Sequence, residues 1–426
     1  MSKATAAKRP EPREKTEDNL VRSLVSGERG FHQLPSDLTS DELAGIRREA
    51  LSRISGVDLS HFGHYSLDAT RASSVNCENF IGVTQVPLGV VGPLHVNGDD
   101  GRIEVHAPLA TTEAALVAST NRGCAALRAA GGATVHVEEI GMTRAPVFRT
   151  SGVHETRRFL QWVEEHTEEI RSVAEATSRY LHLVDIRPFA MGSTVLLRFR
   201  FECGDAMGMN MVTIASDRVV EEVIEPGTGI ECVALSGNFC VDKKPADINF
   251  LEGRGKRIFA DVLLDREILR KVLKTSAAQL VEVQYRKNLL GSIAAGSHGF
   301  NAHFANVIAA FFVATGQDPA HVVEGSLGIT CIEPRGPESV YASVYLPDVP
   351  LGAIGGGMEL ATQKTALRVL GVEPDPQNPG KAVRRLAEIL GGLVLAGEIS
   401  LMAAFTSRDL ARAHEMLGRG TTREDR

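Results

Sequence analysis

The sequence has no CxxC pair and no cysteine spacing typical of a zinc site. We expect reduced thiols in a cytoplasmic protein from its six cysteines, Cys77, Cys124, Cys203, Cys232, Cys240 and Cys331. An excess of positive charge is also missing, because 46 lysines and arginines face 53 aspartates and glutamates and the net charge is -7. We therefore expect no metal, no nucleic acid and no anionic membrane as the main partner. Because the chain as a whole is negatively charged, it can bind an anionic ligand only where cationic side chains are clustered locally.

A good membrane-spanning segment is missing as well. The longest apolar run, 389–405, is interrupted by Gly391, Gly392, Gly397 and Glu398. It falls short of the roughly 20 apolar residues that a span requires, so we interpret it as a buried helix. The N-terminus lacks the apolar stretch of a signal peptide, and we expect neither secretion nor membrane attachment.

The chain of 426 residues is long enough for two or three domains. The N-terminal segment 1–35 begins with a charged stretch that is poor in large apolar side chains, and we expect it to be disordered. Segments 36–145 and 235–410 contain helices rich in alanine and glycine and are expected to form one large domain. The last residues, 411–426, are interpreted as a tail that can act as a flap.

Between these segments, residues 146–234 have a different pattern. Charged and apolar residues alternate at helical spacing over 151–180, and residues 195–202 alternate at the period of a half-buried strand. A second helix is expected near 219–224 and a second strand near 232–235. We predict an α+β fold in which this small α+β domain is inserted into the helix-rich large domain.

Residues 205–211 follow the predicted strand and precede the predicted helix. Free backbone N–H groups at a helix start can hold a phosphate, so this segment is a candidate nucleotide site. It does not match GxGxxG, and Gly227-Thr228-Gly229 is more typical of a turn. A Rossmann domain is therefore not predicted.

Four polar residues stand in small, apolar or glycine-rich sequence: Glu113, Lys243, Asp318 and His414. Burying such groups is costly without partners, which suggests a shared pocket. Two acids, a cation and a histidine can reduce a polarised carbonyl and protonate the leaving group. Simpler explanations stay open: Glu113, expected in the first turn of a helix that starts at Thr112, suits the helix dipole, and surface lysines are usually only solvated.

The motifs from Arg71 to Arg419 strongly resemble the 3-hydroxy-3-methylglutaryl-coenzyme A (HMG-CoA) reductase family. In chain order they are CENFIGVTQVPLGVVGPL, TTEAALVASTNRGC, GMTRAPV, GDAMGMNM, SGNFCVDKKPADINFLEGRGK, SHGFNAHFAN, GQD, GGGMELATQ, LAGEISLMAA and HEMLGR. The resemblance implies a ferredoxin-like small domain for NADP(H) and assigns catalysis to the four residues named above. The resemblance implies that the hydroxymethylglutaryl group is bound by Arg144, Ser236, Asn238, Asp242, Lys244, Lys287 and Asn301, and that Asn121 and Arg122 lie toward coenzyme A.

It also implies that the dinucleotide is bound by Asp205, Met207, Gly208, Met209, Asn210, Gly355, Gly356 and Gly357. Ser178 and Arg179 are implied to bind its 2′-phosphate.

The resemblance implies the four-electron reduction of HMG-CoA to mevalonate and coenzyme A by two NADPH. An arginine at the 2′-phosphate favours NADPH over NADH. The resemblance also implies a homodimer or higher oligomer whose active sites are built from two chains, with the ENFIG segment near the contact. The membrane anchor and the regulatory serine of eukaryotic members are not carried over, since Gly420 stands at the serine position. Two alternatives stay open: an NAD-linked oxidation of mevalonate, and a coenzyme A or nucleotide-binding protein without catalysis.

Overall fold

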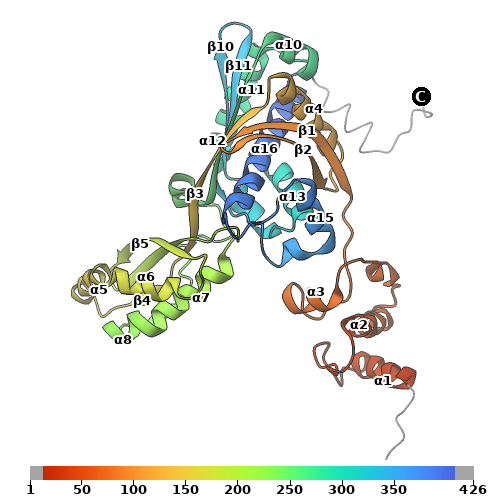
Figure 1. Cartoon of the computed structure of the whole chain (residues 1–426), viewed down its shortest axis with the longest axis vertical. Helices are drawn as coiled ribbons and strands as arrows, with labels where there is room; N and C mark the ends of the chain where they lie inside the picture. Colours follow the sequence, from red (N-terminus) through yellow and green to blue (C-terminus); the bar gives the residue numbers. More distant parts are fainter. Residues whose placement is uncertain (1–12, 408–426) are drawn as a thin grey trace, which may run out of the picture. The chain divides into compact units, whose positions relative to one another are not determined.

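A computed structural model describes residues 13–407 of the chain, which divide into two compact units. Unit 1 comprises the described residues up to 86 together with 360–362, and unit 2 comprises 87–359 and the described residues from 363. Figure 1 labels many of their helices and strands. All candidate site residues that the structure describes belong to unit 2.

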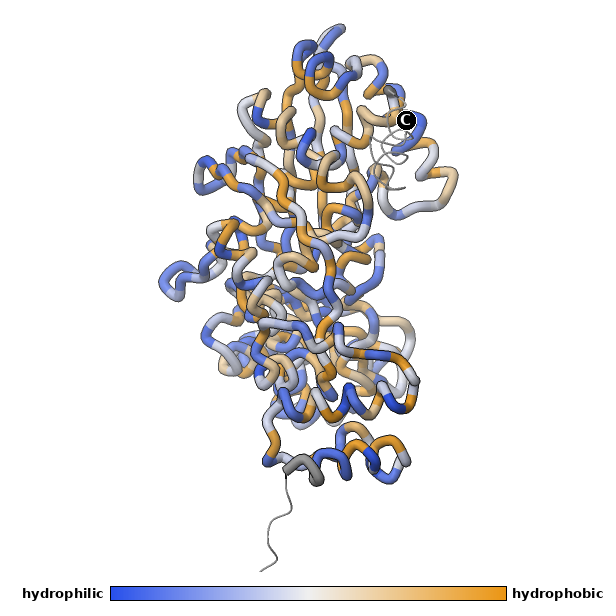
Figure 2. The backbone as a smooth tube through the Cα atoms, turned by 90° about the vertical axis from the view of Figure 1, so that its right-hand side faces the viewer, coloured by the Kyte–Doolittle hydropathy of each residue, from blue (hydrophilic) through white to orange (hydrophobic). Residues whose placement is uncertain are grey.

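Unit 1 is built on three helices, α1 (Arg13–Val25), α2 (Ser40–Ser55) and α3 (Ala69–Val75), with a short 3₁₀ turn, η1 (Ser60–Gly63). Helix α2 begins at a capping box, in which the Thr39 hydroxyl accepts the Glu42 N–H and the Glu42 carboxylate accepts the Thr39 N–H. Blue and orange alternate along these helices in Figure 2, as expected of amphipathic helices. Their apolar faces meet where Leu20, Val21 and Leu24 pack with Ile46 and Ala50.

The expectation of disorder through residue 35 is wrong for the described part of that segment. Helix α1 has enough apolar residues on one face to bury a small cluster against α2, which offsets the cost of ordering the charged remainder. Residues 1–12 lie outside the described part of the chain.

Unit 2 contains a mixed sheet, and this confirms the α+β class of the fold. The strand order is β7-β4-β6-β3-β8-β11-β10-β9, with β1 and β2 attached through β3 and with β5 paired to β6. Pairs β1–β3 and β9–β10 are parallel, and the other pairs are antiparallel. The strands are β1 (Leu88–Gly98), β2 (Gly101–Ala110), β3 (Ala133–Arg144), β4 (Val147–Arg149), β5 (His182–Met191), β6 (Thr194–Glu202), β7 (Cys232–Ala234), β8 (Arg254–Leu264), β9 (Gly299–Phe300), β10 (Gly328–Arg335) and β11 (Ser339–Val349).

The helices of the rest of the chain cover the strands or connect them (Figure 1). They are α4 (Leu116–Ala129), α5 (Val153–Glu165), α6 (Thr167–Glu175), α7 (Met209–Val219), α8 (Glu225–Thr228), α9 (Asp247–Glu252), α10 (Arg266–Ile268), α11 (Ala277–Val283), α12 (Ser292–Ala295), α13 (Phe304–Thr315), α14 (Val322–Gly325), α15 (Ala361–Val369) and α16 (Lys381–Ser407). Short 3₁₀ turns are η5 (Pro319–His321) and η6 (Gly357–Glu359), and π-helical segments are η2 (Val220–Ile224), η3 (Leu269–Leu273) and η4 (Gln284–Gly291).

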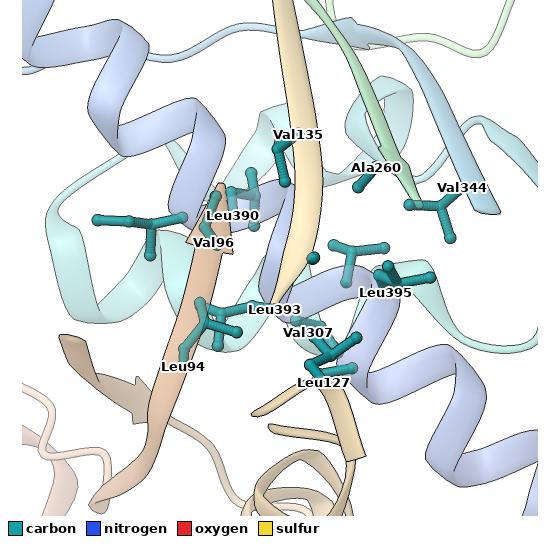
Figure 3. Packing of buried hydrophobic residues seen from close by; sticks show 14 of the residues in the cluster. Leu94, Val96, Leu127, Val135, Ala260, Val307, Val344, Leu390, Leu393 and Leu395 are labelled. Carbon is teal, nitrogen blue, oxygen red and sulfur yellow. The ribbon is translucent and has the colours of Figure 1, made fainter. Parts of the chain in front are cut away.

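Helix α16 forms the centre of the larger hydrophobic core. Figure 3 shows its leucines, Leu390, Leu393 and Leu395, beside apolar side chains of β1, β3, β8 and β11. By length and composition this helix could cross a membrane, but 83% of its most apolar stretch is buried inside the unit. The interpretation of the apolar run as a buried helix is therefore confirmed, and the glycines in the run allow β-strands to approach its backbone.

A second hydrophobic core lies between strands β4 to β7, helices α5 to α7 and the segment η2. Phe148, Phe159, Phe199 and Phe201 fill it. These strands run in the order β7-β4-β6-β5, and every neighbouring pair is antiparallel. Strand β3 links the two parts of the sheet, since residues 134–141 pair with β8 and residues 142–144 pair with β6.

Two details of this second core differ from the sequence prediction. The strand predicted at 195–202 is present as β6, but it is buried on both faces, because Arg198 is held inside by Glu252 and Asn249. Strand β5 was not predicted, and it contains Pro188 and charged residues. As an edge strand, β5 pairs with β6 alone and can accommodate them.

Candidate active site

The Lys243 ammonium and the Asp318 carboxylate form an ion pair in unit 2, with Nζ 2.7 Å from Oδ2. Lys243 lies in the loop between β7 and α9, and Asp318 follows α13 and caps the turn η5 by accepting the Ala320 N–H. The two side chains are 42% and 36% exposed, so a substrate can reach them. The structure therefore brings together two of the four residues that the sequence placed in a catalytic pocket.

The pair is held in its charged form. The hydrogen bond that Lys243 donates to Asp318 raises the pKa of Lys243, and burial opposes this only in part. Burial raises the pKa of Asp318, but the hydrogen bonds from Lys243 and Ala320 and the nearby His321 outweigh it, so that this pKa lies below its ordinary value. A lysine held cationic beside a carboxylate is suited to stabilise an oxyanion that forms next to it.

The loop that carries Lys243 has a strained backbone. Asn238, Val241 and Lys243 have φ angles of 61°, 50° and 58°, in the left-handed region that residues with a side chain rarely adopt. The Lys243 N–H donates to Glu324 Oε1 at 3.0 Å, and the Val241 carbonyl accepts from Asn249. These contacts from buried side chains hold the loop in a conformation that its sequence alone does not favour.

Beneath the loop lies a group of buried charges. Arg254 is fully buried and donates to Asp242 Oδ1 at 2.7 Å and to Glu324 Oε1 at 3.2 Å. His321 is also buried, and its Nδ1 lies 2.6 Å from the same Glu324 oxygen. Burial raises the pKa of Asp348 to about 7, although Arg254 beside it acts in the opposite direction.

Asp242, His321 and Glu324 bring ligand atoms within 4.8 Å of one another, as a metal site would. The guanidinium of Arg254 already contacts both carboxylates, and it provides the positive charge that an ion would supply. A metal at this point would have to displace a buried arginine. The absence of a metal remains a prediction from the sequence.

Glu113 lies ahead of helix α4, which begins at Leu116, and not within its first turn as predicted. Ala115 has a φ of 74° and so cannot continue a helix toward Glu113. The exposed Glu113 carboxylate accepts a hydrogen bond from Asn306 Nδ2 at 3.1 Å. It borders an open hollow of about 450 Å³, which is lined by Val90, Glu113, Ala114, Ala115, Val117, Ala118 and Asn121.

Helix α13 separates Glu113 from the Lys243–Asp318 pair. Asn306, the partner of Glu113, lies in the first turn of α13, whereas Asp318 follows its C-terminal end. A helix of 12 residues is about 18 Å long. Within one chain the expected pocket is therefore divided into two parts, and His414 lies outside the described residues.

Several of the expected substrate residues lie around these two parts. Asn238 accepts from Lys244 at 3.3 Å, and Ser236 contacts Cys240 at 3.5 Å, so both belong to the Lys243 loop. Asn301 caps the start of α13 by accepting the Phe304 N–H. On α4, Asn121 accepts the Gly92 N–H at 2.9 Å.

Three expected cations contact other polar or aromatic groups. Arg144 donates to the hydroxyl of Thr213 on α7, and Arg122 donates to the hydroxyl and carbonyl of Ser400. Lys287 lies in the π-helical segment η4, with Nζ 5.2 Å from the centre of the Phe405 ring. Burial lowers the pKa of Lys287.

Two of the residues expected at the dinucleotide, Ser178 and Asp205, line a second hollow of about 220 Å³. Its lining consists of Ser178, Tyr180, Cys203, Asp205, Ala206, Met211, Ile354, Pro374, Asp375, Pro376 and Pro379. Arg179 is beside it, with its guanidinium 4.6 Å from the centre of the Tyr180 ring. The Asp205 carboxylate is buried and accepts the Val383 N–H, and the Asp205 carbonyl accepts from Ala353 and Ile354.

Two chain segments approach closely at this hollow. Helix α7 begins after Gly208, whose φ is 100° and where a side chain would meet Cys203 Sγ at 2.3 Å. Met207, Met209 and Asn210 follow the strand as predicted, and a bridge between Ala206 and Ile354 joins them to the segment of Gly355, Gly356 and Gly357. A side chain at Gly357 would meet the Gly316 carbonyl at 2.2 Å.

Comparison with known proteins identifies the family. A sequence profile described as hydroxymethylglutaryl-coenzyme A reductase matches residues 44–419. The chain belongs to this family. A 3-hydroxy-3-methylglutaryl-coenzyme A reductase of Methanothermobacter thermautotrophicus is 50% identical over 94% of this chain and 100% of its own length. The Pyrococcus abyssi reductase is 46% identical over 94% and 99% of the two chains.

The fold is also similar to that of a solved structure, the class II reductase of Streptococcus pneumoniae bound to NADPH in open conformations. The TM-score is 0.63 and the identity 17%, over 93% of this chain and 97% of the other. At this identity the likeness concerns the fold alone. It agrees with the mixed α+β architecture of unit 2.

The sequence alone did not point to four residues that contact the candidate site residues. Arg254, His321 and Glu324 lie beneath the Lys243 loop, and Asn306 holds Glu113. Asn306 stands inside the SHGFNAHFAN motif and Arg254 inside SGNFCVDKKPADINFLEGRGK, and His321 lies three positions after the aspartate of GQD. Polar residues within or next to these motifs were the available signal. The partners of Arg254 and Asn306 lie far away in the sequence, so the signal did not show what they contact.

Proposed function

We propose that this protein reduces HMG-CoA to mevalonate and coenzyme A in the cytoplasm, as a step toward isoprenoid precursors, with two NADPH as reductants. The observation that carries the proposal is the accessible Lys243–Asp318 ion pair in a chain of this family. A cation that is held beside a carboxylate and is partly shielded from water can stabilise the negative charge that forms on a carbonyl oxygen during hydride addition. All residue roles below belong to this proposal.

Addition of a hydride to the thioester carbonyl carbon moves an electron pair onto its oxygen. Lys243 donates a hydrogen bond to that oxyanion, while Asp318 orients the ammonium. Arg144, Ser236, Asn238, Asp242, Lys244, Lys287 and Asn301 bind the hydroxymethylglutaryl group, and Asn121 and Arg122 bind coenzyme A. Protonation of the oxyanion yields a hemithioacetal.

The hemithioacetal then loses its hydroxyl proton, its C–S bond breaks, and an aldehyde and a coenzyme A thiolate form. His414 gives the thiolate a proton, which is easy because the pKa of a free thiol is about 8.5. The aldehyde carbon accepts the second hydride. Glu113 then protonates the resulting alkoxide, and mevalonate is released.

Two NADPH molecules, bound one after the other, would each supply one hydride. The hollow beside Asp205 is suited to bind a dinucleotide. Residues 206 and 354 pair there through their backbones, and the backbone N–H groups at the start of α7 can hold a phosphate. Asp205, Met207, Gly208, Met209, Asn210 and Gly355, Gly356 and Gly357 surround it. Ser178 and Arg179 lie where a 2′-phosphate would bind, which favours NADPH.

We assign NADP(H) binding to residues 146–234 as a small ferredoxin-like domain inserted into the large domain, 36–145 and 235–410. Support comes from the order β-α-β-β-α-β and from the antiparallel neighbours β7-β4-β6-β5, which are those of a split βαβ unit. A Rossmann domain would need a parallel sheet. Residues 411–426, with His414, act as a flap that opens for exchange of the dinucleotide.

Catalysis requires a homodimer or higher oligomer with shared sites. Within one chain, α13 keeps Glu113 about a helix length from Lys243 and Asp318, too far for one small substrate group to contact all three. A second copy can bring its own Glu113 to this Lys243. Sedimentation tests the idea, because a fully active monomer contradicts it.

The central test is an NADPH-oxidation assay on the purified protein with HMG-CoA. We expect two NADPH consumed and one free thiol released for each HMG-CoA. Lys243→Ala is expected to lower kcat by at least about 10²-fold with the fold retained, as for loss of one oxyanion donor. Lys271→Ala is the matched control, an exposed lysine paired with Glu267 that is not among the proposed site residues. NADPH oxidation without thiol release, or full activity of Lys243→Ala, overturns the proposal.

A further inference from the structure

Glu324 connects the Lys243 loop with the interior of the protein. Its side chain is fully buried, and its Oε1 accepts three hydrogen bonds: from the Lys243 N–H at 3.0 Å, from Arg254 Nη1 at 3.2 Å and from His321 Nδ1 at 2.6 Å. A single carboxylate oxygen thereby fixes one backbone group and two buried side chains. The backbone group belongs to the residue with the left-handed φ of 58°.

His321 extends this group to the other half of the ion pair. Its ring is 1% exposed and spans the space between two carboxylates. On the other side of the ring, Nε2 lies 3.8 Å from Asp318 Oδ2 and has no hydrogen-bond partner among the described residues. Because a buried ring nitrogen without a partner is costly, its position facing Asp318 calls for an explanation.

Arg254 balances the charge of the group. It is fully buried and contacts Asp242 and Glu324, and its Nε donates to the Thr143 hydroxyl at 3.1 Å. With Thr143 on β3 and Arg254 on β8, the arginine ties the group to the sheet. Groups anchored in this way cannot follow a substrate, so they can hold a strained loop in one geometry.

We propose that Arg254, Glu324 and His321 form a positioning triad for the Lys243–Asp318 pair. Glu324 holds the Lys243 backbone in its left-handed conformation, and His321 holds the Asp318 carboxylate toward Lys243. None of the three has to touch the substrate. The triad deepens the proposed function, on which it rests, by naming the residues that keep its ion pair in place.

The structure predicts a specific kinetic change for His321→Gln, which retains an amide donor but removes the imidazole. We expect kcat to fall by about tenfold to 10²-fold with KM for HMG-CoA nearly unchanged, because the loss is one of alignment. Since His321 lowers the pKa of Asp318, its removal should also move the acid limb of the kcat profile to higher pH. The charged groups that face His321 are the carboxylates of Asp318, Glu324 and Asp242. These carboxylates are in turn paired with Lys243 and Arg254, and the buried Asp348 lies near Arg254 and Glu324.

Glu324→Gln tests the contact between Glu324 and Lys243 without an activity measurement. Among the causes that raise the pKa of Lys243 is the Glu324 charge, so this substitution should lower that pKa. Reductive ¹³C-methylation of lysines reports the titration of Lys243 by NMR, and Lys243→Arg assigns its signal. This readout works without substrate, so it separates failure of the triad from failure of the proposed reaction.

Matched controls are His95→Gln and Glu388→Gln. His95 is buried and paired with Glu104, and Glu388 is buried and accepts the Asp99 N–H, both remote from Lys243. The triad is supported when His321→Gln loses kcat and shifts the acid limb while His95→Gln does neither. It is overturned when His321→Gln and Glu324→Gln change only the thermal midpoint, or when the Lys243 titration in Glu324→Gln equals that in Glu388→Gln.

Discussion

Gly123 provides a sharp test of how the site is packed. It lies inside α4, directly after Asn121 and Arg122, where the helix crosses α16. A Cβ atom there would lie 1.9 Å from the Ala396 carbonyl oxygen, 2.4 Å from its carbon and 2.8 Å from its Cα. Ordinary contacts between such atoms are about 3.5 Å, so Gly123→Ala forces the two helices apart by more than an ångström.

Two effects of Gly123→Ala on the free energy of unfolding oppose each other. Alanine in place of glycine inside a helix stabilises by roughly 0.5–1 kcal/mol. Overpacking costs typically about 1–3 kcal/mol, and the upper end applies here because the clash is with the backbone of a buried helix and not with a flexible side chain. We therefore expect a net destabilisation of about 1–2 kcal/mol or more.

Urea unfolding followed by circular dichroism measures this difference. At a slope of about 2–3 kcal/mol per M, the midpoint of Gly123→Ala should fall by roughly 0.5 M or more. Gly45→Ala is the control, since Gly45 also lies inside a helix but has only an Arg48 side-chain atom 4.0 Å away, and its midpoint should not fall. An unchanged or higher midpoint for Gly123→Ala would show that α4 and α16 are not packed as described.

Two further predictions concern charge. The pKa of Asp348 is raised to about 7 in the folded protein, so the stability that this group contributes is present below its unfolded pKa and is lost as pH rises toward 7. Asp348→Asn should flatten the fall of the thermal midpoint between about pH 4 and 7, and an unchanged slope argues against a buried neutral carboxyl. For the dinucleotide, Arg179→Ala should raise KM for NADPH by about tenfold and leave KM for NADH nearly unchanged, because only NADPH carries the 2′-phosphate. Equal effects on both cofactors in initial-rate kinetics would place Arg179 elsewhere.

The sequence predicts those elements whose pattern is local. The alternation over 195–202 marks strand β6, and the apolar run 389–405 lies in α16, the helix that was expected to be buried. The order of long motifs likewise indicated the family. In these cases the residues that decide the structure are neighbours in the chain.

The sequence does not predict arrangements that depend on distant partners. Arg254 reaches Thr143, 111 positions away, and the Lys243 N–H reaches Glu324, 81 positions away. Glu113 was placed in a helix because its surroundings suit one, but the left-handed Ala115 breaks the helix just after it. The division of the site by α13 likewise follows from tertiary packing and not from motif spacing.

The charges of the site form two layers with different energetics. Lys243 and Asp318 are 42% and 36% exposed, and ion pairs in contact with water contribute little to stability. Arg254 and Glu324 are fully buried, where loss of one partner leaves a costly unpaired charge. Substitutions in the upper layer should therefore lower kcat with little effect on unfolding, whereas those in the lower layer should lower both. This separation suits the catalytic role proposed for Lys243 and Asp318, because the two exposed charges would have to exchange water for substrate while the buried charges keep their positions constant.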